Sequence, residues 1–446
     1  MTPTTSSQEQ TPGAATFDAL VLGGGIAGMQ AALDLAEQGY EVALVEKGPS
    51  LGGNMIKLSK VFPTLDCASC ITTPKMASVA HHKRITIFTL CELQEVAGER
   101  GDFRATLRQE PRYVDPDKCI GCLKCEMNCP ILVPSDEQGR VTARKAIYIP
   151  YSNAIPMVPR LEVESCILCG RCARVCPTQA VNYFEEPRVL TLNFRALVVA
   201  TGYRLMEDYP AKVWNLAAPL PNLIDSLTME RLLAPTGPYL KLLRPGDGKV
   251  PESVAFLQCV GSRDPQLGVP YCSRVCCMYH IKQAMLLARE HPGIKLTVYY
   301  IDLRCFGKGY EQFLLNARAA GIEFVKARAV VEGASPDGGI RLRYEDQEDG
   351  GTLKTRDHDL GVMALALLPQ NVSREVPGLA LAPDGFLAPA QPKLAPTLTS
   401  RPGVFMAGVA AGPKDIVDTV VEAGAAAAEA AIYLAALDFK AKHAAA

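Results

Sequence analysis

The chain has 446 residues, of which 48% are hydrophobic and 21% charged, a composition typical of a folded protein with two or three domains. Its 46 Lys and Arg residues nearly balance its 47 Asp and Glu residues. This balance excludes the bulk positive charge that would hold nucleic acid or an anionic membrane. We therefore expect no nucleic-acid partner.

From the residues near the two ends of the sequence we expect neither a signal peptide nor a membrane span. Residues 1–16, "MTPTTSSQEQTPGAAT", lack the basic and apolar parts of a signal peptide, so we predict a flexible tail. We also expect no membrane span, because Lys414, Asp415, Asp418 and Glu422 interrupt the Ala-rich C-terminal region. The protein should be cytoplasmic, with any membrane attachment made through a partner. In that reducing compartment, 16 closely spaced cysteines indicate metal or redox chemistry rather than structural disulfides.

A dinucleotide-binding unit opens the folded chain. "FDALVLGGGIAGMQAALDLAEQGYEVALVEKG" is typical of a strand, a turn with Gly23-x-Gly25-x-x-Gly28, a helix and a second strand that ends at Glu46. Glycines let the backbone approach a pyrophosphate, the helix N-terminus stabilises its charge, and the carboxylate can accept a hydrogen bond from a ribose hydroxyl. FAD and NAD would both suit this unit.

Later segments favour FAD. "GPSLGGNM", with Gly52 and Gly53, resembles the second glycine pair of FAD-dependent two-domain reductases. "RALVVATGY", with Thr201 and Gly202, resembles the strand and turn by which such chains return to the FAD domain.

A C-terminal segment, "RPGVFMAGVAAGPKDIVDTV", resembles the last FAD-binding strand and helix of the same reductases and contains Gly408. Val409 occupies the place of their usual Asp, which contacts the ribityl chain. Lys414 and Asp415 are then the nearest polar candidates for the flavin end of the site. The alternative is that they form a solvated helix start.

Two similar runs, "CIGCLKCEMNCP" and "CILCGRCARVCP", interrupt the flavin pattern. Each is C-x2-C-x2-C-x3-C-P, the bacterial ferredoxin pattern in which three cysteines bind one cubane and the fourth crosses to the other. Zinc seldom takes four cysteines so compactly and then repeats the run. We predict two [4Fe-4S] clusters, one on Cys119, Cys122, Cys125 and Cys176 and the other on Cys166, Cys169, Cys172 and Cys129.

A second nucleotide-binding pattern follows, with "ESVAFLQ" as a strand, "MYHIKQAMLLARE" as a helix and "IKLTVYYID" as the next strand. Where a glycine-rich loop would hold NAD(P)H, this chain has Cys259, Cys272, Cys276 and Cys277. Four thiolates at a strand-to-helix turn match the ligand count of a third [4Fe-4S] cluster, and NAD(P) is not expected here. We expect the adjacent pair to lie on the turn itself. Buried free cysteines and a redox disulfide are the alternatives.

These motifs carry a resemblance over nearly the whole chain after residue 17. "LQCVGSRD", "YCSRVCCMYHIKQA", "YYIDLRCFGKGYEQF", "FPTLDCASCITTPKM" and "AGVAAGPKDIVDTV" resemble the A-type subunits of the heterodisulfide reductase family. The resemblance implies FAD, an atypical cubane on the C-x12-C-x3-C-C run and an inserted ferredoxin. Compared with the long methanogen form, we expect neither its N-terminal cluster domain nor its C-terminal ferredoxin extension here.

The predicted fold class is α/β, with two Rossmann-like domains of the thioredoxin-reductase type and an inserted α+β ferredoxin domain. We expect the FAD domain in three parts, residues 17–111, 188–215 and 372–446. The ferredoxin domain should occupy residues 112–187, and the second nucleotide-binding-like domain residues 216–371.

Four cysteines remain. Cys67 and Cys70 could be two ligands of a cluster completed from elsewhere, a redox dithiol beside the flavin, or structural thiols. Cys91 and Cys305 lie next to strand-like sequence and are expected to be core thiols.

The predicted function is electron transfer by an oxidoreductase component in which FAD and the clusters carry the chemistry. The resemblance implies B-type and C-type partner subunits, a ferredoxin, hydrogenase or dehydrogenase as donor, and a homodimer within a larger complex. It leaves open whether electrons bifurcate. The alternatives are a subunit of a quinone-interacting, membrane-associated oxidoreductase and a stand-alone NAD(P)H flavoreductase.

Overall fold

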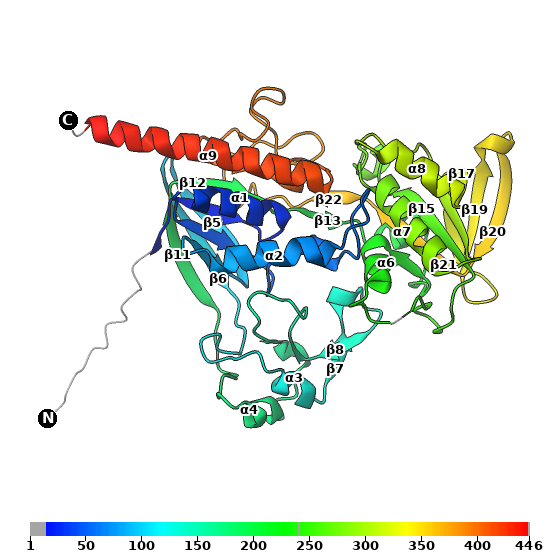
Figure 1. Ribbon diagram of the computed structural model, residues 1–446, viewed down its shortest axis with the longest axis horizontal. Helices are drawn as coiled ribbons and strands as arrows, with labels where there is room; N and C mark the ends of the chain where they lie inside the picture. The colour runs from blue at the N-terminus through cyan, green and yellow to red at the C-terminus, as the bar shows by residue number, and fades with distance from the viewer. Residues whose placement is uncertain (1–14, 240, 445–446) are drawn as a thin grey trace.

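The computed structural model describes residues 15–239 and 241–444 (Figure 1). Residues 1–14 of the predicted tail lie outside this range. The last two residues of that tail, Ala15–Thr16, form the short strand β1 and pair in parallel with β11, so the predicted tail extended two residues too far.

The FAD domain is built on a five-stranded parallel sheet in the order β23-β12-β2-β3-β4. Four of its strands, all but β4, are buried along their whole length, because layers cover both faces and the sequence there is continuously apolar. The strands are β2 Ala19–Leu22, β3 Val42–Val45, β4 Ile85–Phe88, β12 Ala196–Val199 and β23 Val404–Met406.

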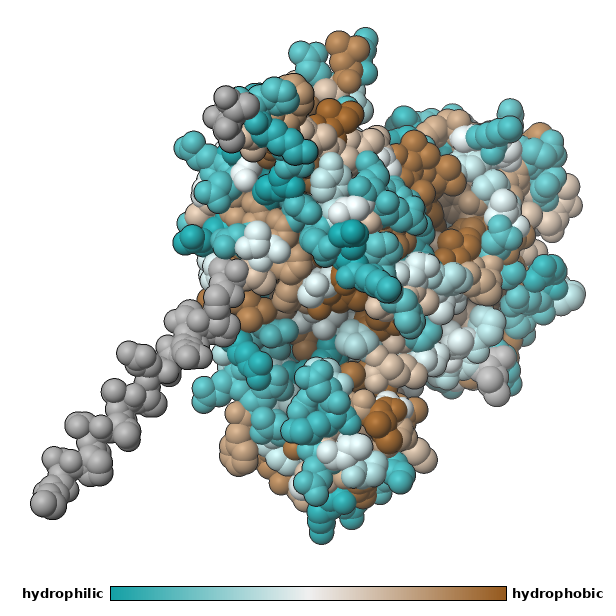
Figure 2. Space-filling view, turned by 60° about the vertical axis from the view of Figure 1, so that its left-hand side comes forward, coloured by the Kyte–Doolittle hydropathy of each residue, from teal (hydrophilic) through white to brown (hydrophobic). Residues whose placement is uncertain are grey.

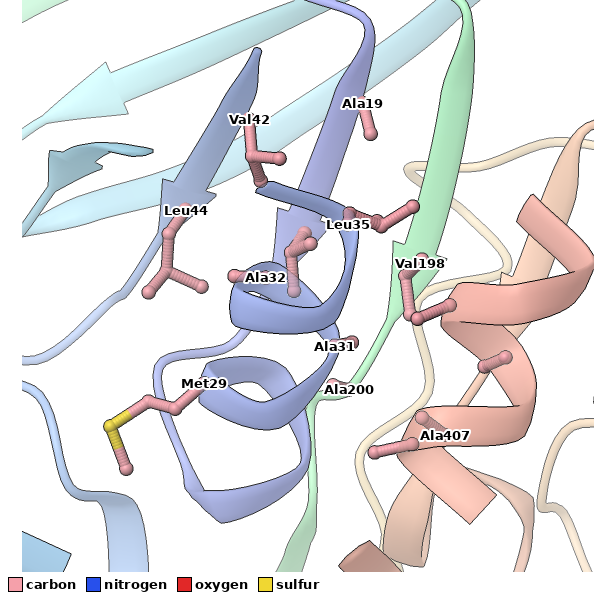
Figure 3. Close-up of a cluster of buried hydrophobic side chains, with 14 of the residues drawn as sticks. Ala19, Met29, Ala31, Ala32, Leu35, Val42, Leu44, Val198, Ala200 and Ala407 are labelled. Atoms are coloured by element: carbon pink, nitrogen blue, oxygen red, sulfur yellow. The ribbon is translucent and has the colours of Figure 1, made fainter. Parts of the chain in front are cut away.

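Helices cover one face of this sheet and a second sheet covers the other. The helices are α1 Ile26–Glu37, α2 Ala68–His81 and α9 Ile416–Ala444. In Figure 3, Ala31 of α1 faces the neighbouring C-terminal helix, where small side chains allow a close approach, and Met29 points to the opposite side of α1. The opposite layer has the order β1-β11-β6-β5, with β5 Cys91–Glu99, β6 Asp102–Gln109 and β11 Arg188–Phe194.

Helix α9 contradicts the expectation that no segment is long and apolar enough to span a bilayer. By length and composition alone, Ile416–His443 qualifies, although a third of its apolar stretch (33%) is buried in this fold. The expectation failed because Lys414 and Asp415 precede the helix and Asp418 lies in its first turn. After Asp418 only two glutamates interrupt the long alanine-rich stretch.

The cysteine-rich insert lies between β6 and β11 and forms a separate lobe at the bottom of Figure 1. Its two short helices, α3 Lys124–Asn128 and α4 Arg171–Val175, pack on one small core. Its strands pair in two antiparallel hairpins, β7 Leu132–Pro134 with β8 Ala143–Lys145, and β9 Ile147–Tyr148 with β10 Arg160–Leu161.

The second nucleotide-binding-like domain is a parallel sheet in the order β14-β21-β15-β16-β17. These strands are β14 Leu223–Asp225, β15 Ser253–Val260, β16 Lys295–Tyr300, β17 Glu323–Lys326 and β21 Leu360–Leu365. Its helices are α6 Ser226–Leu233, α7 Cys276–Glu290 and α8 Tyr310–Ala319, and an antiparallel sheet of β18 Val330–Ala334, β19 Ile340–Asp346 and β20 Thr352–His358 flanks it. The chain crosses between the domains in α5 Tyr209–Val213 and in the antiparallel pair of β13 Tyr203–Leu205 with β22 Leu367–Pro369.

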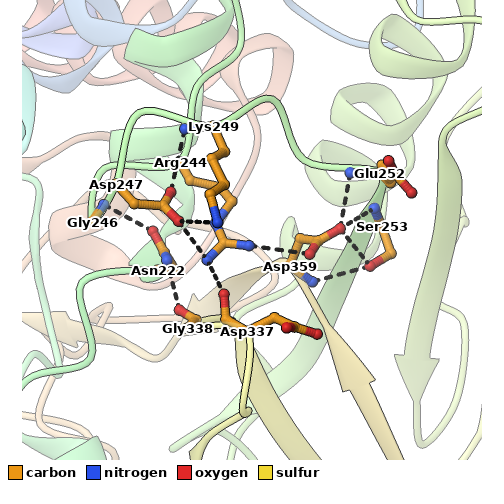
Figure 4. A network of polar contacts seen from close by, with 10 residues as sticks. All are labelled: Asn222, Arg244, Gly246, Asp247, Lys249, Glu252, Ser253, Asp337, Gly338 and Asp359. Atoms are coloured by element: carbon orange, nitrogen blue, oxygen red, sulfur yellow. Dashed lines mark hydrogen bonds and ion pairs between the residues drawn. The ribbon is translucent and has the colours of Figure 1, made fainter.

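A buried arginine holds the edge of this second domain together (Figure 4). Arg244 is 3% exposed and pairs with Asp247 at 3.0 Å and Asp359 at 3.1 Å, while it also donates to the carbonyl oxygen of Asp337 at 2.7 Å. Asp359 in turn accepts hydrogen bonds from the backbone N–H groups of Glu252 and Ser253. The network therefore ties the start of β15 to the start of β21, and so fixes the strand that carries the first cysteine of the site described below.

Candidate functional site

The glycine loop after β2 is tightly packed at Gly23 and Gly28, where an added Cβ would overlap backbone atoms. A Cβ atom on Gly28 would lie 1.8 Å from the carbonyl oxygen of Gly23. Gly25 is the N-cap of α1, and no side chain caps this helix start. The first N–H groups of α1 are therefore left for a ligand, as a pyrophosphate-binding helix requires.

Glu46 lies at the end of β3, where the sequence analysis placed it. Its carboxylate accepts hydrogen bonds from the N–H groups of Gly24 at 2.7 Å and Gly48 at 2.6 Å. Burial raises the pKa of Glu46, and these backbone bonds oppose the shift. Each carboxylate oxygen keeps a second lone pair, so the group can still accept from a ribose hydroxyl.

A cavity of about 980 Å³ extends from this loop to the second domain. This volume is at the upper end of the range for small-molecule sites, which suits an extended dinucleotide. Most of the predicted FAD residues line the cavity, namely Gly23, Gly25, Glu46, Gly53, Thr201, Gly202, Lys414 and Asp415. Gly28, Gly52 and Gly408 are not part of the lining. They lie behind it, where Gly408 packs against Ala27 and Thr419.

Val409 stands where the related reductases have an Asp. The chain next to Val409 is held by buried polar contacts. The Lys414 ammonium, 8% exposed, donates to the carbonyl oxygen of Gly408 at 2.8 Å and pairs with Glu422 at 2.6 Å. Burial lowers the pKa of Lys414. Asp415 accepts a hydrogen bond from the hydroxyl of Tyr310 at 2.6 Å. Both residues face the cavity, so neither is a solvated helix start.

A buried ion pair on the second-domain side of the cavity was missed by the sequence analysis. Glu230 of α6 and Lys282 of α7 contact each other directly at 2% and 1% exposure, and both line the cavity. Desolvation lowers the pKa of Lys282, and the Glu230 charge opposes that effect. The pair also bridges the domains, because Lys282 donates to the carbonyl oxygen of Lys60 at 2.8 Å and the Ser59 N–H donates to Glu230 at 3.0 Å.

One serine–histidine contact also lies at this cavity, and its geometry excludes a hydrolytic dyad. Ser226 donates its hydroxyl hydrogen to the carbonyl oxygen of Met363 at 2.8 Å and lies 2.7 Å from Nε2 of His280. Nε2 must therefore carry the proton and cannot remove one from Ser226. Burial lowers the pKa of His280 to about 3, so the ring is neutral.

The eight ferredoxin-type cysteines gather in the insert. Six of them, Cys119, Cys125, Cys129, Cys166, Cys172 and Cys176, form or contact its core. Backbone N–H groups already point at three of the sulfurs, from Gly121 at 3.4 Å, Leu168 at 3.3 Å and Ala180 at 3.3 Å. Cubane clusters in ferredoxins are held by thiolates and tuned by such N–H to sulfur hydrogen bonds, so the donor set fits these clusters.

The second cysteine group converges at the carboxyl end of β15. Cys259 lies inside the strand with a positive φ of 56° and a register irregularity beside it, and Cys272 lies in the following loop. Cys276 and Cys277 are the first two residues of α7. The expectation that they lie on the turn was therefore wrong. Both can serve one site because the first turn of a helix is open at its N-terminal end.

The four sulfurs of this group interact with one another. Cys276 is buried and within hydrogen-bonding reach of the other three thiols, and its hydrogen bond lowers the pKa of Cys272 to about 6. The N–H of Arg274 also donates to the Cys272 sulfur at 3.3 Å. In the part of the chain that the structure describes, no three His, Cys, Asp or Glu side chains form a site for a single metal ion. Four thiolates are nevertheless the donor set of a cubane.

The remaining cysteines take different positions. Cys67 is the N-cap of α2 and forms a disulfide with Cys70, its neighbour in the first turn. This pairing matches the dithiol alternative, and the ligand alternative stays untested. Cys91 is 1% exposed and lines the cavity. Cys305 is half-buried beside the core of the second domain.

The fold and these donor groups define a class of protein, a flavoprotein of the thioredoxin-reductase type that carries cysteine-rich cluster sites. Residues 18–59 match the FAD binding domain model, and residues 118–181 match the 4Fe-4S dicluster domain model. Two solved structures share the fold, thioredoxin reductases of T. acidophilum (TM-score 0.54, 15% identity, 95% of this chain and 99% of that one) and Lactococcus lactis (0.51, 12%, 94% and 99%). At these identities they are informative about the fold alone.

Curated relatives give a more specific similarity. The chain is 42% identical to the A-type subunit of the H(2):CoB-CoM heterodisulfide,ferredoxin reductase of Methanothermobacter marburgensis, over 93% of this chain and 63% of that protein. It is 43% identical to an A-type iron-sulfur subunit of the CoB--CoM heterodisulfide reductase of Methanopyrus kandleri, over 94% and 65%. These comparisons confirm the resemblance to the A-type subunits of heterodisulfide reductases. The chain spans just under two thirds of the length of these relatives.

Proposed function

We propose that the chain is the FAD and iron–sulfur electron-transfer subunit of a heterodisulfide-reductase-like complex, with B-type and C-type subunits as partners. The observation that carries this proposal is in the second domain, where three cysteines grouped around the buried Cys276 occupy, together with it, the position of a nicotinamide-binding loop. An NAD(P)H-dependent reductase needs that loop for the phosphates. In this chain, electrons enter and leave through clusters instead, and NAD(P) is not a cofactor.

The residues around the cavity would hold FAD in an extended form. The free N–H groups at the start of α1 bind the pyrophosphate, and Glu46 receives the ribose hydroxyl. Lys414 and Asp415 lie at the flavin end of the cavity. Bound there, FAD supplies the ability to exchange electrons either in pairs or singly. The proposal keeps the domain boundaries predicted from the sequence. Electron bifurcation is one use that such a site could serve.

The insert is the proposed electron entrance or exit. Large apolar side chains are exposed beside its cysteines, among them Ile120 at 67%, Met127 at 77% and Ile167 at 63%. Figure 2 shows brown patches on this lowest lobe of the molecule. Exposed apolar surface around a redox centre suits a transient protein partner, because it removes water from the path between two clusters. A ferredoxin, hydrogenase or dehydrogenase-type donor fits this surface, in a complex that is cytoplasmic and contains two copies of this chain.

Cysteine substitution with iron and flavin counting tests the proposal. Anaerobically purified Cys276→Ser should lose about four iron atoms per chain while it keeps its FAD, because one cubane loses a ligand. The matched control is Cys91→Ser, which changes another buried thiol outside the cysteine group and should keep all its iron. Unchanged iron in Cys276→Ser, or rapid flavin reduction by NADH in the wild-type chain, would contradict it. Subunits that copurify anaerobically identify the partners.

A further inference from the structure

The two halves of the insert hold equivalent cysteines in equivalent positions. Cys125 is the second residue of α3 and Cys172 is the second residue of α4, and each helix follows a residue with a positive φ. Both cysteines are buried in the same small core. The backbone N–H groups of Glu126 and Ala173 face the two sulfurs in the same way. A difference between the two sites must therefore come from the surrounding side chains.

One side chain, Tyr183, makes the two sites unequal. Its hydroxyl oxygen lies 2.9 Å from the Cys172 sulfur. In the part of the chain that the structure describes, the hydrogen bonds to the Cys125 sulfur come from the backbone alone. The other cluster has a hydroxyl near its ligand Cys176, but this contact, from Thr178, is longer at 3.6 Å. The short contact between a hydroxyl and a sulfur is therefore the one at Cys172.

Hydrogen bonds on both sides of Tyr183 hold this residue in place. The N–H of Asn182 donates to the carbonyl oxygen of Tyr113 at 2.9 Å. Two residues beyond Tyr183, the carboxylate of Glu185 accepts from the Tyr113 N–H at 2.6 Å. The Tyr183 ring itself is half-buried against the core of the insert. The fold of the insert thus fixes the hydroxyl beside the Cys172 sulfur.

We propose that Tyr183 is a positioning residue for electron transfer, which acts through Cys172 and raises the reduction potential of the cluster that Cys172 binds. The proposed ligands of that cluster are Cys129, Cys166, Cys169 and Cys172. A cluster ligand is a thiolate without a hydrogen of its own, so the phenol must be the donor. Reduction adds a negative charge to the cluster, and a hydrogen bond to sulfur stabilises that charge. The hydroxyl therefore favours this cluster as the place where an electron rests in the insert.

This role rests on the cluster ligands of the proposed function and adds a distinction between the two clusters of the insert. The iron content of the chain tests the ligands, whereas a potential measured at full iron content tests Tyr183. The two can therefore fail separately. A wild-type insert without its iron would contradict the proposed function, and an unchanged potential at full iron content would contradict the role of Tyr183 alone.

A redox titration of the anaerobically purified holo-chain, followed by EPR, tests the role of Tyr183. Tyr183→Phe removes only the hydroxyl group. At a fixed potential, the ratio of reduced to oxidised cluster should fall by up to about ten-fold for one of the two magnetically coupled clusters, because the hydrogen bond is stronger in the reduced state. The other cluster should keep its potential. In heavy water, the affected cluster of the wild type should show a coupling to an exchangeable deuteron that Tyr183→Phe removes.

The matched control is Tyr113→Phe, which removes a hydroxyl group from another tyrosine beside the same core and should leave both potentials unchanged. The wild type and both variants should contain the same amounts of iron and FAD. Unchanged potentials in Tyr183→Phe at full iron content, or equal shifts in the two variants, overturn the proposal. Loss of iron in Tyr183→Phe alone would also overturn it, because the hydroxyl would then be needed for cluster assembly.

Discussion

The two nucleotide-binding-like units of this chain share an architecture and differ at one place, the connection between the first strand and its helix. In the FAD domain, this connection is a glycine loop in which Gly25 leaves the first N–H groups of α1 open. In the second domain, the corresponding connection carries Cys259, Cys272, Cys276 and Cys277. The same position in the same fold can therefore hold a phosphate or a set of thiolates, since both are anions at a helix N-terminus.

The difference predicts which substitutions each loop tolerates, and the largest effect is expected at Gly28. Gly28→Ala places a Cβ 1.8 Å from the backbone oxygen of Gly23, so the loop must move and bound FAD should be lost. Because the clash is with backbone atoms, no side-chain rotation relieves it, and the flavin content should fall to near zero. Gly25→Ala is the matched control, because its Cβ meets only Gly53 at 3.9 Å. Gly25→Ala should leave the melting temperature of the FAD-free protein unchanged. It should weaken only FAD binding, because the added methyl group would contact the pyrophosphate. Flavin content and calorimetry separate these results, and a Gly28→Ala chain with full FAD would contradict the account.

The glycine and cysteine loops could be predicted from the sequence because residue type and local spacing specify their chemistry. Glu46 and the C-x2-C runs are recognisable within a few residues. The Glu230–Lys282 pair could not be found in this way, because its members are 52 positions apart and meet only when α6 packs beside α7. The one available signal was a charged residue on the apolar face of each helix, which requires a buried partner.

Two sequence predictions were wrong for a related reason. One placed Cys276 and Cys277 on a turn, and the other expected no long apolar helix in the region of α9. Where a helix begins is set by tertiary contacts rather than by the residues alone, and α7 starts at the first of the two cysteines. Likewise, Lys414 and Asp415 interrupt the apolar pattern in the sequence but precede α9 in the structure. Spacing predicts which ligands form a group, and packing decides which of them lie in a helix.

The second domain has cysteines where the first has a glycine loop, and it contributes a buried ion pair to the cavity. Breaking that pair should have the next largest effect. Lys282→Met leaves the Glu230 carboxylate buried at 2% exposure without its cation. Removing one member of a buried pair costs about 3–5 kcal/mol. Urea unfolding should show this loss, and adding Glu230→Gln should recover part of it. Lys47→Met, which breaks the exposed pair with Glu92, is the control and should change little. Equal effects of Lys282→Met and Lys47→Met would show that the buried pair is dispensable.

The smallest expected effect is a pH dependence confined to the second domain. That domain contains two buried histidines. His280 is 0% exposed, and His358 is 4% exposed and hydrogen-bonded to the Tyr299 hydroxyl at 2.9 Å. Burial lowers the pKa of His358 from 6.5 to about 4 and that of His280 to about 3.

Because the unfolded state binds the proton first, each histidine removes stability as the pH falls from about 6.5 toward its folded pKa, on the order of 2–3 kcal/mol by pH 4. Above pH 6.5 both rings are neutral in the folded and the unfolded state, so the penalty disappears.

Hydrogen exchange at pH 7 and pH 5 should show faster opening of β15, β16 and α7 at the lower pH, with β2, β3 and α1 changing less. His358→Gln keeps a polar side chain that cannot titrate in this range, so it should reduce the pH dependence of the second domain. Equal acceleration in both domains would locate the acid sensitivity elsewhere and remove this distinction between the two units.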